Sequence, residues 1–363
     1  MYEFFKKGIR GGMTFVNKHY IKAENKETGN PSSSNYIAYW DENNLYGNAL
    51  SQLLPCSNFE WLTRHEIANL EWSTIDTEGE FGYTLMVDME YPDNIHDKTQ
   101  DFPLAPESGM VTEDMLTPYM SDLWNARCEL RGQPESFKSE KKLLMTCTDK
   151  KEYVVHFKVL KFYLQMGMRI TAIHKVIRYK QAAIFKDYIN DNSAKRQAAT
   201  SEFEKDLYKL LNNALFGKTM ENVRGRKKYN LRNNEVSMLK DTSKPHYLHS
   251  HRFAEDLVLN ELMNLEVKLN KPIFIGQAVL DLRKLTMFEL RYRKFPAYEA
   301  EFGGSITVVG GDTDSLFCFI ENINLNEQPH PAMVRDGLLD FQLSTQSSLV
   351  FNNFQGQAGM YQG

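Results

Sequence analysis

The stretch GGDTDSLF, Gly310 to Phe317, places two aspartates one residue apart between the apolar runs ITVV and LFCF. Side chains at positions i and i+2 of a strand point the same way, so Asp312 and Asp314 share one face. The flanking residues predict a β-hairpin. Two carboxylates at a hairpin tip suit a divalent cation, but Asp and Gly are also common turn residues. By itself the stretch therefore leaves open an acidic turn and half of a metal site.

A second short strand leads to another aspartate. In NYIAYWDENNLYGNAL the run Tyr36 to Trp40 is typical of a strand, and the residues after Asp41 are compatible with a helix. If this strand neighbours the hairpin, Asp41 meets Asp314. Carboxylates bind Mg²⁺ with positions left open for phosphate oxygens, and two such ions can activate a hydroxyl and stabilise a leaving phosphate. The alternative interpretation of Asp41 is a helix N-cap, and one residue can serve both purposes.

The clearest predicted helix is SEFEKDLYKLLNNALFGKTMENV, residues 201–223, with Ser201 and Glu204 as a capping box. Its predicted apolar stripe consists of Phe203, Leu207, Leu210, Leu211 and Ala214. Spacings of four, seven and eight residues put a second set on one side: Lys209, Asn213, Phe216 and Gly217. An ammonium, an amide, an aromatic plane and a gap can together hold a phosphate, a sugar and a base. For the helix alone, a core Phe216 and a solvated Lys209 are favoured.

Periodicity predicts several further elements. Strands are expected at residues 80–92 and 169–180, and helices at residues 153–167 and 273–293, the latter buried with a basic edge. Residues 225–252 are predicted to be polar and turn-rich, while residues 252–272 fit helix, strand or both. The histidines of HYLHSH are predicted to lie in an exposed loop rather than a metal site: His246, His249 and His251.

Composition limits the class of protein. The chain has 363 residues, 42% of them hydrophobic, and a formal net charge of -4, so bulk charge does not indicate a polyanionic partner. Its four cysteines form no CxxC pair, which argues against a disulfide framework or a zinc site. No signal-peptide or membrane-spanning run is present. We therefore expect a soluble intracellular protein with no membrane partner, in the nucleus, cytoplasm or mitochondrion.

Three segments in series, DENNLYGNAL (41–50), KLLNNALFGK (209–218) and GDTDS (311–315), resemble the polymerase motifs of family B DNA polymerases. The similarity is to the protein-primed branch found in viruses, linear plasmids and virus-like transposons, whose motifs are close to D-x-N-S-L-Y-P, K-x-x-x-N-S-x-Y-G and D-T-D-S. GIRGG (8–12) also resembles the glycine-containing linker that precedes the first motif in this branch. The resemblance extends to about residue 322.

The resemblance implies a catalytic centre in which Asp41 and Asp314 are the principal ligands of two Mg²⁺ ions, or Mn²⁺ in their place. Asp312 would be a secondary ligand or an electrostatic partner. Tyr46 would lie beneath the incoming sugar and exclude a 2′-hydroxyl, while backbone amides through Leu45 would contact the triphosphate.

The resemblance also assigns the nucleotide and DNA contacts. Lys209 would bind nucleotide phosphates, with Arg196 as a second phosphate contact and Lys205 as a weaker candidate. Asn213, Phe216 and Gly217 would shape the pocket for the nascent base pair. A basic cluster after the second motif would contact primer-template DNA in a salt-dependent way, although a solvated loop is the alternative: Lys218, Arg224, Arg226, Lys227 and Lys228.

The chain departs from the family pattern at several places. Gly47 replaces a proline, Ala214 a serine and Phe216 a tyrosine, which puts selectivity in doubt more than activity. Few residues precede GIRGG, where the family's exonuclease lies. Beyond residue 322 neither the K-x-Y element nor the thumb is matched, and Gly359 of AGMYQG stands where a lysine is expected.

The implied fold is α+β, a polymerase palm on an antiparallel sheet with helical fingers, and with the exonuclease and thumb largely absent. The expected division is palm at 1–50 and 271–322, terminal-protein-region-like insertions at 51–170 and 222–270, fingers at 171–221, and an unmatched tail at 323–363. The implied reaction joins a deoxynucleoside triphosphate to a primer 3′-hydroxyl, with a terminal protein as a possible primer. Two alternatives stay open: a truncated remnant that binds nucleic acid without catalysis, and an unrelated Mg²⁺ phosphohydrolase.

Overall fold

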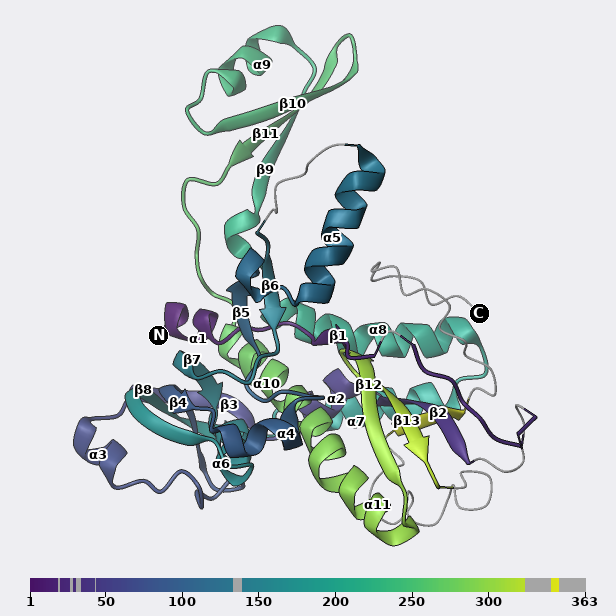
Figure 1. The fold of residues 1–363 in the computed structure, drawn as a ribbon. Coiled ribbons are helices and arrows are strands. Elements are labelled where there is room, and N and C mark those ends of the chain that lie inside the picture. The colour runs from purple at the N-terminus through teal and green to yellow at the C-terminus, as the bar shows by residue number, and fades with distance from the viewer. Residues whose placement is uncertain are drawn as a thin grey trace.

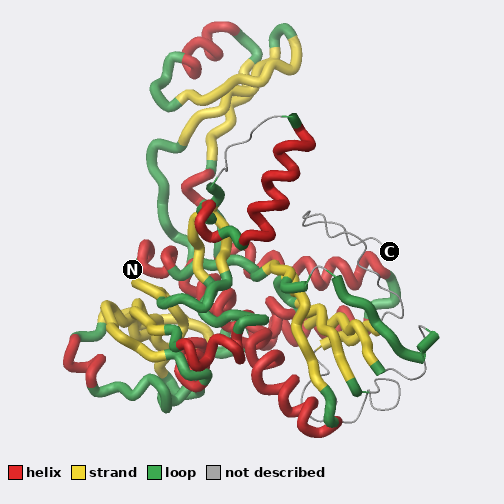
Figure 2. The backbone as a smooth tube through the Cα atoms, viewed as in Figure 1, coloured by secondary structure: helices red, strands yellow, loops and turns green. Residues whose placement is uncertain are grey.

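The computed structural model describes residues 1–18, 20–26, 29–30, 34–42, 44–132, 139–323 and, as a strand, 341–345. Its sheets are antiparallel and are joined by helices, so the predicted α+β class is confirmed. Figure 2 shows the strands gathered into separate groups with helices between them. None of the helices in these residues is long and apolar enough to cross a bilayer.

The sheet that carries Asp312 and Asp41, here called the aspartate sheet, has the strand order β1-β12-β13-β2-β14. Its strands are β1 (Thr14–Val16), β12 (Ser305–Asp312), β13 (Ser315–Glu321), β2 (Asn35–Glu42) and β14 (Phe341–Thr345). The predicted hairpin is confirmed as β12 and β13, joined by a turn at Thr313 and Asp314. β14 belongs to the tail for which the sequence predicted no structure, whereas Gly359 lies outside the described residues.

A second sheet has the order β3-β8-β4-β7, with α3 (Arg64–Ala68) between β3 and β4. Its strands are β3 (Leu54–Trp61), β8 (Arg169–Ala182), β4 (Phe81–Glu90) and β7 (Lys150–His156). The strands predicted at 80–92 and 169–180 are confirmed. The helix predicted from residue 153 is wrong for its first turn, because Tyr153–His156 pairs with β4 and the helix α6 (Phe157–Gln165) begins only afterwards. The β-branched pair Val154 and Val155 favours the pleated, buried position.

The segment between β4 and β7 contains a two-stranded sheet of β5 and β6, and its residues Ile95, Phe102 and Leu104 belong to the main core. Its elements are η1 (Asp93–Ile95), α4 (His96–Thr99), β5 (Glu107–Met110), η2 (Glu113–Met115), α5 (Pro118–Arg131) and β6 (Lys141–Leu144). None of the residues of α5 is buried, and only Ser121, Trp124 and Cys128, which share one side of the helix, are half-buried.

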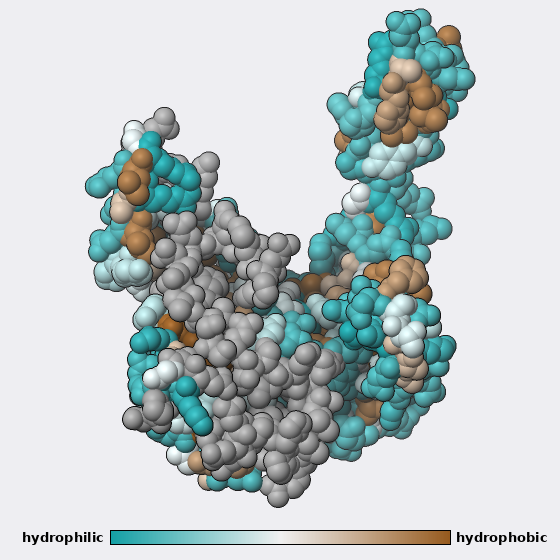
Figure 3. Space-filling model, turned by 90° about the vertical axis from the view of Figure 1, so that its right-hand side faces the viewer, coloured by the Kyte–Doolittle hydropathy of each residue, from teal (hydrophilic) through white to brown (hydrophobic). Residues whose placement is uncertain are grey.

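A projecting arm, residues 226–264, stands apart from the rest of the molecule (Figure 1). Its elements are β9 (Lys227–Arg232), α9 (Glu235–Thr242), β10 (Tyr247–Ala254) and β11 (Leu257–Met263), and the 3-10 turn η3 (Val223–Gly225) precedes it. The prediction of turns here is wrong, because β9 and β10 both pair with the more apolar β11. His249 and His251 are exposed as expected, but they lie in a strand. Figure 3 shows apolar side chains gathered on this arm.

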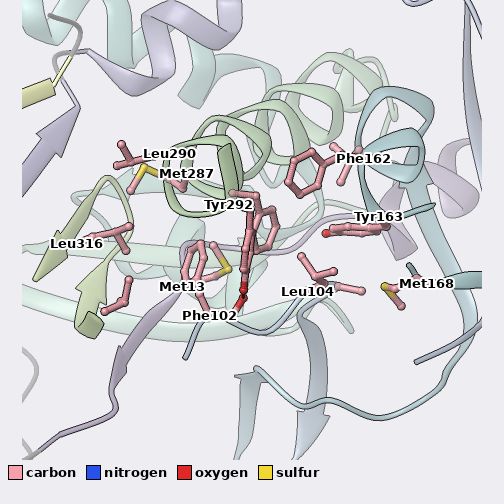
Figure 4. Close-up of a cluster of buried hydrophobic side chains, with 14 of the residues drawn as sticks. Met13, Phe102, Leu104, Phe162, Tyr163, Met168, Met287, Leu290, Tyr292 and Leu316 are labelled. Atoms are coloured by element: carbon pink, nitrogen blue, oxygen red, sulfur yellow. Dashed lines mark hydrogen bonds between the residues drawn. The ribbon is translucent and has the colours of Figure 1, made fainter. Parts of the chain in front are cut away.

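The helix α10 (Ile273–Glu289) runs between the two larger sheets and continues through a π-helical turn, η4 (Leu290–Lys294), into α11 (Phe295–Phe302). It contacts α1 (Tyr2–Lys7), α2 (Leu45–Ser51), α6, β3 and β7. Its predicted burial is confirmed, and Met287 lies in the core cluster of Figure 4 with Leu290 and Tyr292 of η4. The predicted basic edge is wrong at Arg283 and Lys284, which are 2% and 4% exposed.

The helix α8 (Glu202–Thr219) is confirmed, and the Ser201 hydroxyl accepts a hydrogen bond from the Glu204 amide. It packs on α7 (Lys186–Ala198), and Nδ2 of the Asn192 side chain donates to Oδ1 of the Asn212 side chain at 2.9 Å. The predicted apolar stripe is not core among the described residues. Phe203 is 76% exposed and Leu210 is 61% exposed, because the polar side with Asn212 faces α7.

Candidate active site

Backbone pairing brings the three aspartates to one end of the aspartate sheet. Asp41 of β2 pairs with Ser315 of β13, and Ser315 pairs with Asp312 of β12. The Glu42 amide donates to the Asp314 carbonyl oxygen at 2.9 Å. The expectation that the Asp41 strand neighbours the hairpin is thus confirmed. The N-cap interpretation of Asp41 is wrong, because Asp41 lies within β2 and Asn44 occupies the N-cap position of α2.

Charge is concentrated at this end of the sheet. Burial raises the pKa of the Asp314 carboxyl, and repulsion from Asp41 and Asp312 raises it further, while Arg283 opposes the rise. The Tyr39 hydroxyl donates to Asp41 Oδ2 at 2.9 Å. Burial and this hydrogen bond raise the pKa of Tyr39 to about 12, against the lowering effect of Ser315. An electropositive ligand would relieve the repulsion between the carboxylates.

The carboxylates fit a hard divalent cation by their chemistry, since oxygen donors are what Mg²⁺ prefers. Within the described ranges, no group of three His, Cys, Asp or Glu side chains is placed to hold a metal ion. Asp312 Oδ1 instead accepts hydrogen bonds from the Thr14 hydroxyl at 2.9 Å and the Thr313 hydroxyl at 3.2 Å. Asp41 and Asp314 as principal ligands, with Asp312 in a secondary position, stay a prediction.

The segment after GIRGG supports the aspartate turn, which the sequence did not predict. The Thr313 amide donates to the Met13 carbonyl oxygen at 2.8 Å, and β1 pairs with β12 next to Asp312. A β-carbon on Gly12 would overlap the Thr313 side chain. Thr313 has a φ of 58°, a left-handed conformation that is costly for a β-branched residue. The turn is thus held in a strained conformation by the chain that precedes the first motif.

The motif on α2 meets the motif on α8 through two aromatic rings. The ring centres of Tyr46 and Phe216 are 4.6 Å apart with an interplanar angle of 41°. Leu45 is buried at the start of α2, whereas Tyr46 is half-buried. For the isolated helix, the sequence favoured a Phe216 in the core. That interpretation is partly right, because Phe216 packs against the apolar cluster that contains Leu50 and Val279 but is only half-buried.

The other predicted nucleotide contacts on α8 face solvent. Lys209 and Asn213 are exposed, and Lys209 has no ion-pair partner among the residues that the structure describes. Apart from its chain neighbours and the backbone of its own helix, no atom lies within 4 Å of the place where a β-carbon on Gly217 would be. Arg196 is half-buried near the end of α7. The described contacts do not join Lys209 or Arg196 to the aspartates.

Arg283 is the site residue that the sequence did not identify. Its Nη1 donates a hydrogen bond to the Tyr46 hydroxyl, and its guanidinium carbon lies 4.8 Å from the centre of the Tyr46 ring. The sequence feature that could have identified Arg283 is its position in the apolar run VLDLRKL. A cation on a buried helix needs a partner, so such a residue indicates a specific contact. Arg283 therefore connects α10 to the motif on α2.

The basic cluster lies where α8 leads into the arm. Four of its members are in ion pairs: Lys218 and Arg226 with Glu221, Arg224 with Glu3, and Lys227 with Glu261. Lys227 and Lys228 are solvated, as the alternative interpretation expects, but they lie in the strand β9 and not in a loop. A polyanion that binds here would have to compete with these carboxylates.

Comparison with known proteins gives the family. The family model described as DNA polymerase type B, organellar and viral, matches residues 1–293, which is more than half of the chain. No curated protein sequence matches the chain significantly.

Solved structures of phi29 DNA polymerase are similar to this chain. The orthorhombic crystal form has a TM-score of 0.44 at 16% identity, over 92% of this chain and 45% of that chain. Phi29 DNA polymerase complexed with primer-template DNA and incoming nucleotide substrates has a TM-score of 0.42 at 16% identity, over 87% of this chain and 42% of that chain. The chain therefore spans less than half the length of these polymerases.

The extent of the family match and the order of the three motifs within one fold lead to a single assignment. This chain belongs to the organellar and viral family of type B DNA polymerases.

Proposed function

We propose that the chain carries the nucleotidyl-transfer centre of a template-directed DNA polymerase that acts in DNA replication. The observation that supports this most strongly is the pairing of β2 with β13, which places Asp41 beside the Asp312–Asp314 turn. A second contact, between Tyr46 and Phe216, connects the nucleotide motifs of α2 and α8. The first motif thus neighbours the third through the aspartate sheet, and it contacts the second through the ring of Tyr46.

In the proposed reaction, a primer 3′-hydroxyl attacks the α-phosphate of a deoxynucleoside triphosphate, and pyrophosphate leaves. Asp41 and Asp314, assisted by Asp312, would hold two Mg²⁺ ions, or Mn²⁺, which when bound supply charge stabilisation and activate the hydroxyl. The role of the remaining residues is to bind and orient the reactants.

The nucleotide would be bound between α2 and α8. Lys209 and Arg196 would neutralise its phosphates, and the backbone amides up to Leu45 would contact the triphosphate at the start of α2. Asn213, Phe216 and Gly217 would border the base pair, and Tyr46 would lie beneath the sugar and oppose a 2′-hydroxyl.

The basic cluster would contact the DNA backbone: Lys218, Arg224, Arg226, Lys227 and Lys228. Four of these side chains are already in ion pairs, so DNA phosphates would have to replace protein carboxylates as well as counterions. We therefore expect DNA affinity to depend strongly on salt concentration. Priming from a terminal protein remains a proposal that rests on the family branch.

We also propose a division of the chain into subdomains. The aspartate sheet with α2 and α10 corresponds to the palm, and α7 with α8 to the fingers. In this division the first insertion would extend beyond residue 170 to Ala182, and the pairing of β8 with β3 and β4 supports this boundary. The second insertion, 222–270, contains the arm.

Primer extension tests the proposal. Purified protein would receive a 5′-labelled primer on a template, Mg²⁺ and deoxynucleotides, and Asp41→Asn and Asp314→Asn would be compared with the wild type. We expect extension that falls by about 10³-fold or more in both variants, since each removes a carboxylate from the reacting centre. Asp97→Asn, an exposed carboxylate of α4, is the matched control and should extend normally.

Two results would contradict the proposal. A folded wild type that binds DNA but does not extend the primer would indicate the non-catalytic remnant. Mg²⁺-dependent release of phosphate from small substrates, without extension and unaffected by Lys209→Ala, would indicate the phosphohydrolase.

A further inference from the structure

Arg283 is a buried cation that faces the proposed sugar-selecting residue. It is 2% exposed, although it lies on a helix surrounded by apolar side chains. Its Nη1 donates to the Tyr46 hydroxyl, and its guanidinium lies 4.8 Å from the Tyr46 ring centre. Its Nε has no hydrogen-bond partner among the described residues. The contacts of this arginine are therefore directed at Tyr46 rather than spread over a network.

The electrostatic surroundings of Arg283 give a reason for keeping a charge at this place. Burial lowers the pKa of the guanidinium, and the opposing effects come from Tyr46, Asp314 and Asp281. Burying a cation is costly unless it is paired, and an apolar residue of similar size is often as stable or more so. The position of Arg283 is thus explained better by its neighbours at the site than by a contribution to stability.

The Tyr46 ring is held by two kinds of contact. Phe216 packs against the ring at 4.6 Å, which restrains it without fixing the hydroxyl. The Arg283 hydrogen bond fixes the hydroxyl, and the guanidinium also lies against the ring. A residue that excludes a 2′-hydroxyl must have a defined position, because a displacement of about 1 Å is enough to weaken such a steric contact.

We propose that Arg283 is a positioning residue that holds Tyr46 in place and thereby sets the discrimination between deoxyribonucleotides and ribonucleotides. This inference rests on the proposed function of Tyr46, and it adds a residue from α10 that lies outside the three motifs. Arg283 acts through Tyr46 and does not touch the substrate.

Nucleotide discrimination is the first test. The ratio of kcat/KM for a deoxynucleotide to that for the matching ribonucleotide would be measured in the wild type and in Arg283→Met, which keeps an unbranched apolar stem and removes the guanidinium. We expect the ratio to fall about tenfold, the effect of losing one charge-assisted hydrogen bond. Arg283→Lys should recover part of it, since an ammonium can donate to the hydroxyl but lacks the planar fork.

A double-mutant comparison separates positioning from a general structural effect. Tyr46→Phe removes the hydroxyl that Arg283 binds, so adding Arg283→Met to it should change the ratio by less than about twofold. Arg291→Met is the matched control, because Arg291 lies on the continuation of the same helix and pairs with Asp101 at 2.8 Å, away from Tyr46. It should leave the ratio at the wild-type value. An unchanged ratio in folded Arg283→Met, or an undiminished effect in the Tyr46→Phe background, would overturn the inference.

A second measurement does not depend on catalysis. With 3-fluorotyrosine at position 46, the ¹⁹F resonance should be sharp in the wild type and in Arg291→Met, and shifted or broadened in Arg283→Met. Thermal melting would establish that the variants are folded. If the wild type does not extend primers, the proposed function fails, yet the ¹⁹F spectrum still decides whether Arg283 holds Tyr46. An identical spectrum in Arg283→Met would refute the contact itself.

Discussion

The backbone amide of Glu42 donates a hydrogen bond to the carbonyl oxygen of Asp314, with 2.9 Å between the nitrogen and the oxygen. This bond joins the residue after Asp41 to the turn that carries the other two aspartates. Because the bond involves only main-chain atoms, replacing either carboxylate by an amide should remove charge without moving the turn. The effects of such variants can therefore be attributed to charge.

Asp314→Asn should separate stability from metal binding. Without divalent ions, the melting temperature of this variant should equal or exceed that of the wild type, because the variant lacks a half-buried carboxylate repelled by Asp41 and Asp312. Mg²⁺ at about five times its dissociation constant should stabilise the wild type by about 1 kcal/mol, and it should stabilise Asp314→Asn less. Differential scanning calorimetry with EDTA and with Mg²⁺ would measure both effects. A variant that melts well below the wild type in EDTA would refute the repulsion.

Gly12→Ala should disturb the aspartate turn from a distance. The new β-carbon would overlap the Thr313 side chain, and Thr313 is already in a left-handed conformation. We expect a loss of about 1–3 kcal/mol in the free energy of unfolding and reduced primer extension. Adding Thr313→Gly should restore much of the stability, since glycine removes the overlap and accepts a positive φ.

Gly11→Ala is the control for this experiment, because no atom lies within 4 Å of its added β-carbon. Urea unfolding of the single and double variants would measure the effect. Equal losses in the Gly11 and Gly12 variants would show that backbone freedom, not the contact with Thr313, matters here.

Asp241→Asn should loosen the arm alone. Asp241 is fully buried and accepts hydrogen bonds from Arg232, Lys244 and Asn230, and the bond to Arg232 is the main cause of the lowered pKa of its carboxyl. Hydrogen exchange should accelerate in residues 227–263 and remain unchanged in β12 and β13, which share no elements with the arm. Asp256→Asn, an exposed carboxylate of the same arm, should have no effect. Accelerated exchange throughout the chain would show that the arm and the body unfold together.

His156 should make folding sensitive to acid. Burial, and then repulsion from Lys158, lower the pKa of its imidazole from 6.5 to about 3. Between pH 6.5 and about pH 3 the unfolded chain therefore carries a proton on His156 and the folded chain does not. The contribution of His156 to the free energy of unfolding is complete above pH 6.5 and falls as the pH approaches 3. Well below pH 6.5 the loss should be about 1.4 kcal/mol per pH unit.

Urea unfolding at several pH values would measure this loss. His156→Leu should lack this part of the slope, and His249→Gln, an exposed histidine of β10, should keep it. Parallel pH profiles for the wild type and His156→Leu would contradict the assignment.

Local patterns in the sequence predicted the elements around the site well. The apolar runs on both sides of GGDTDS predicted the β12–β13 hairpin, and Ser201 marked the start of α8. The proximity of Asp41 to Asp314 could be inferred only by assuming that their strands are neighbours. That assumption was supported by the motif resemblance and not by any property of the strands themselves.

Other features depended on contacts that no local pattern contains. The stripe of α8 had the spacing of a core face, yet Phe203 is exposed because Asn192 of α7 pairs with Asn212 on the other side. Residues 225–252 looked like turns because β9 and β10 are polar, and β11 is needed to pair them. Arg283 looked like an edge residue because the position of Tyr46 on α2 cannot be read from α10.

The Asn192–Asn212 hydrogen bond has a mechanical consequence. Both amides are buried, so sliding α7 along α8 by one turn, or rotating either helix about its axis, would leave two polar groups without partners, at about 1–3 kcal/mol each. We therefore expect α7 and α8 to keep their relative position and to move together as one rigid pair. Arg196 and Lys209, one on each helix, would then approach a triphosphate in a single motion rather than one after the other.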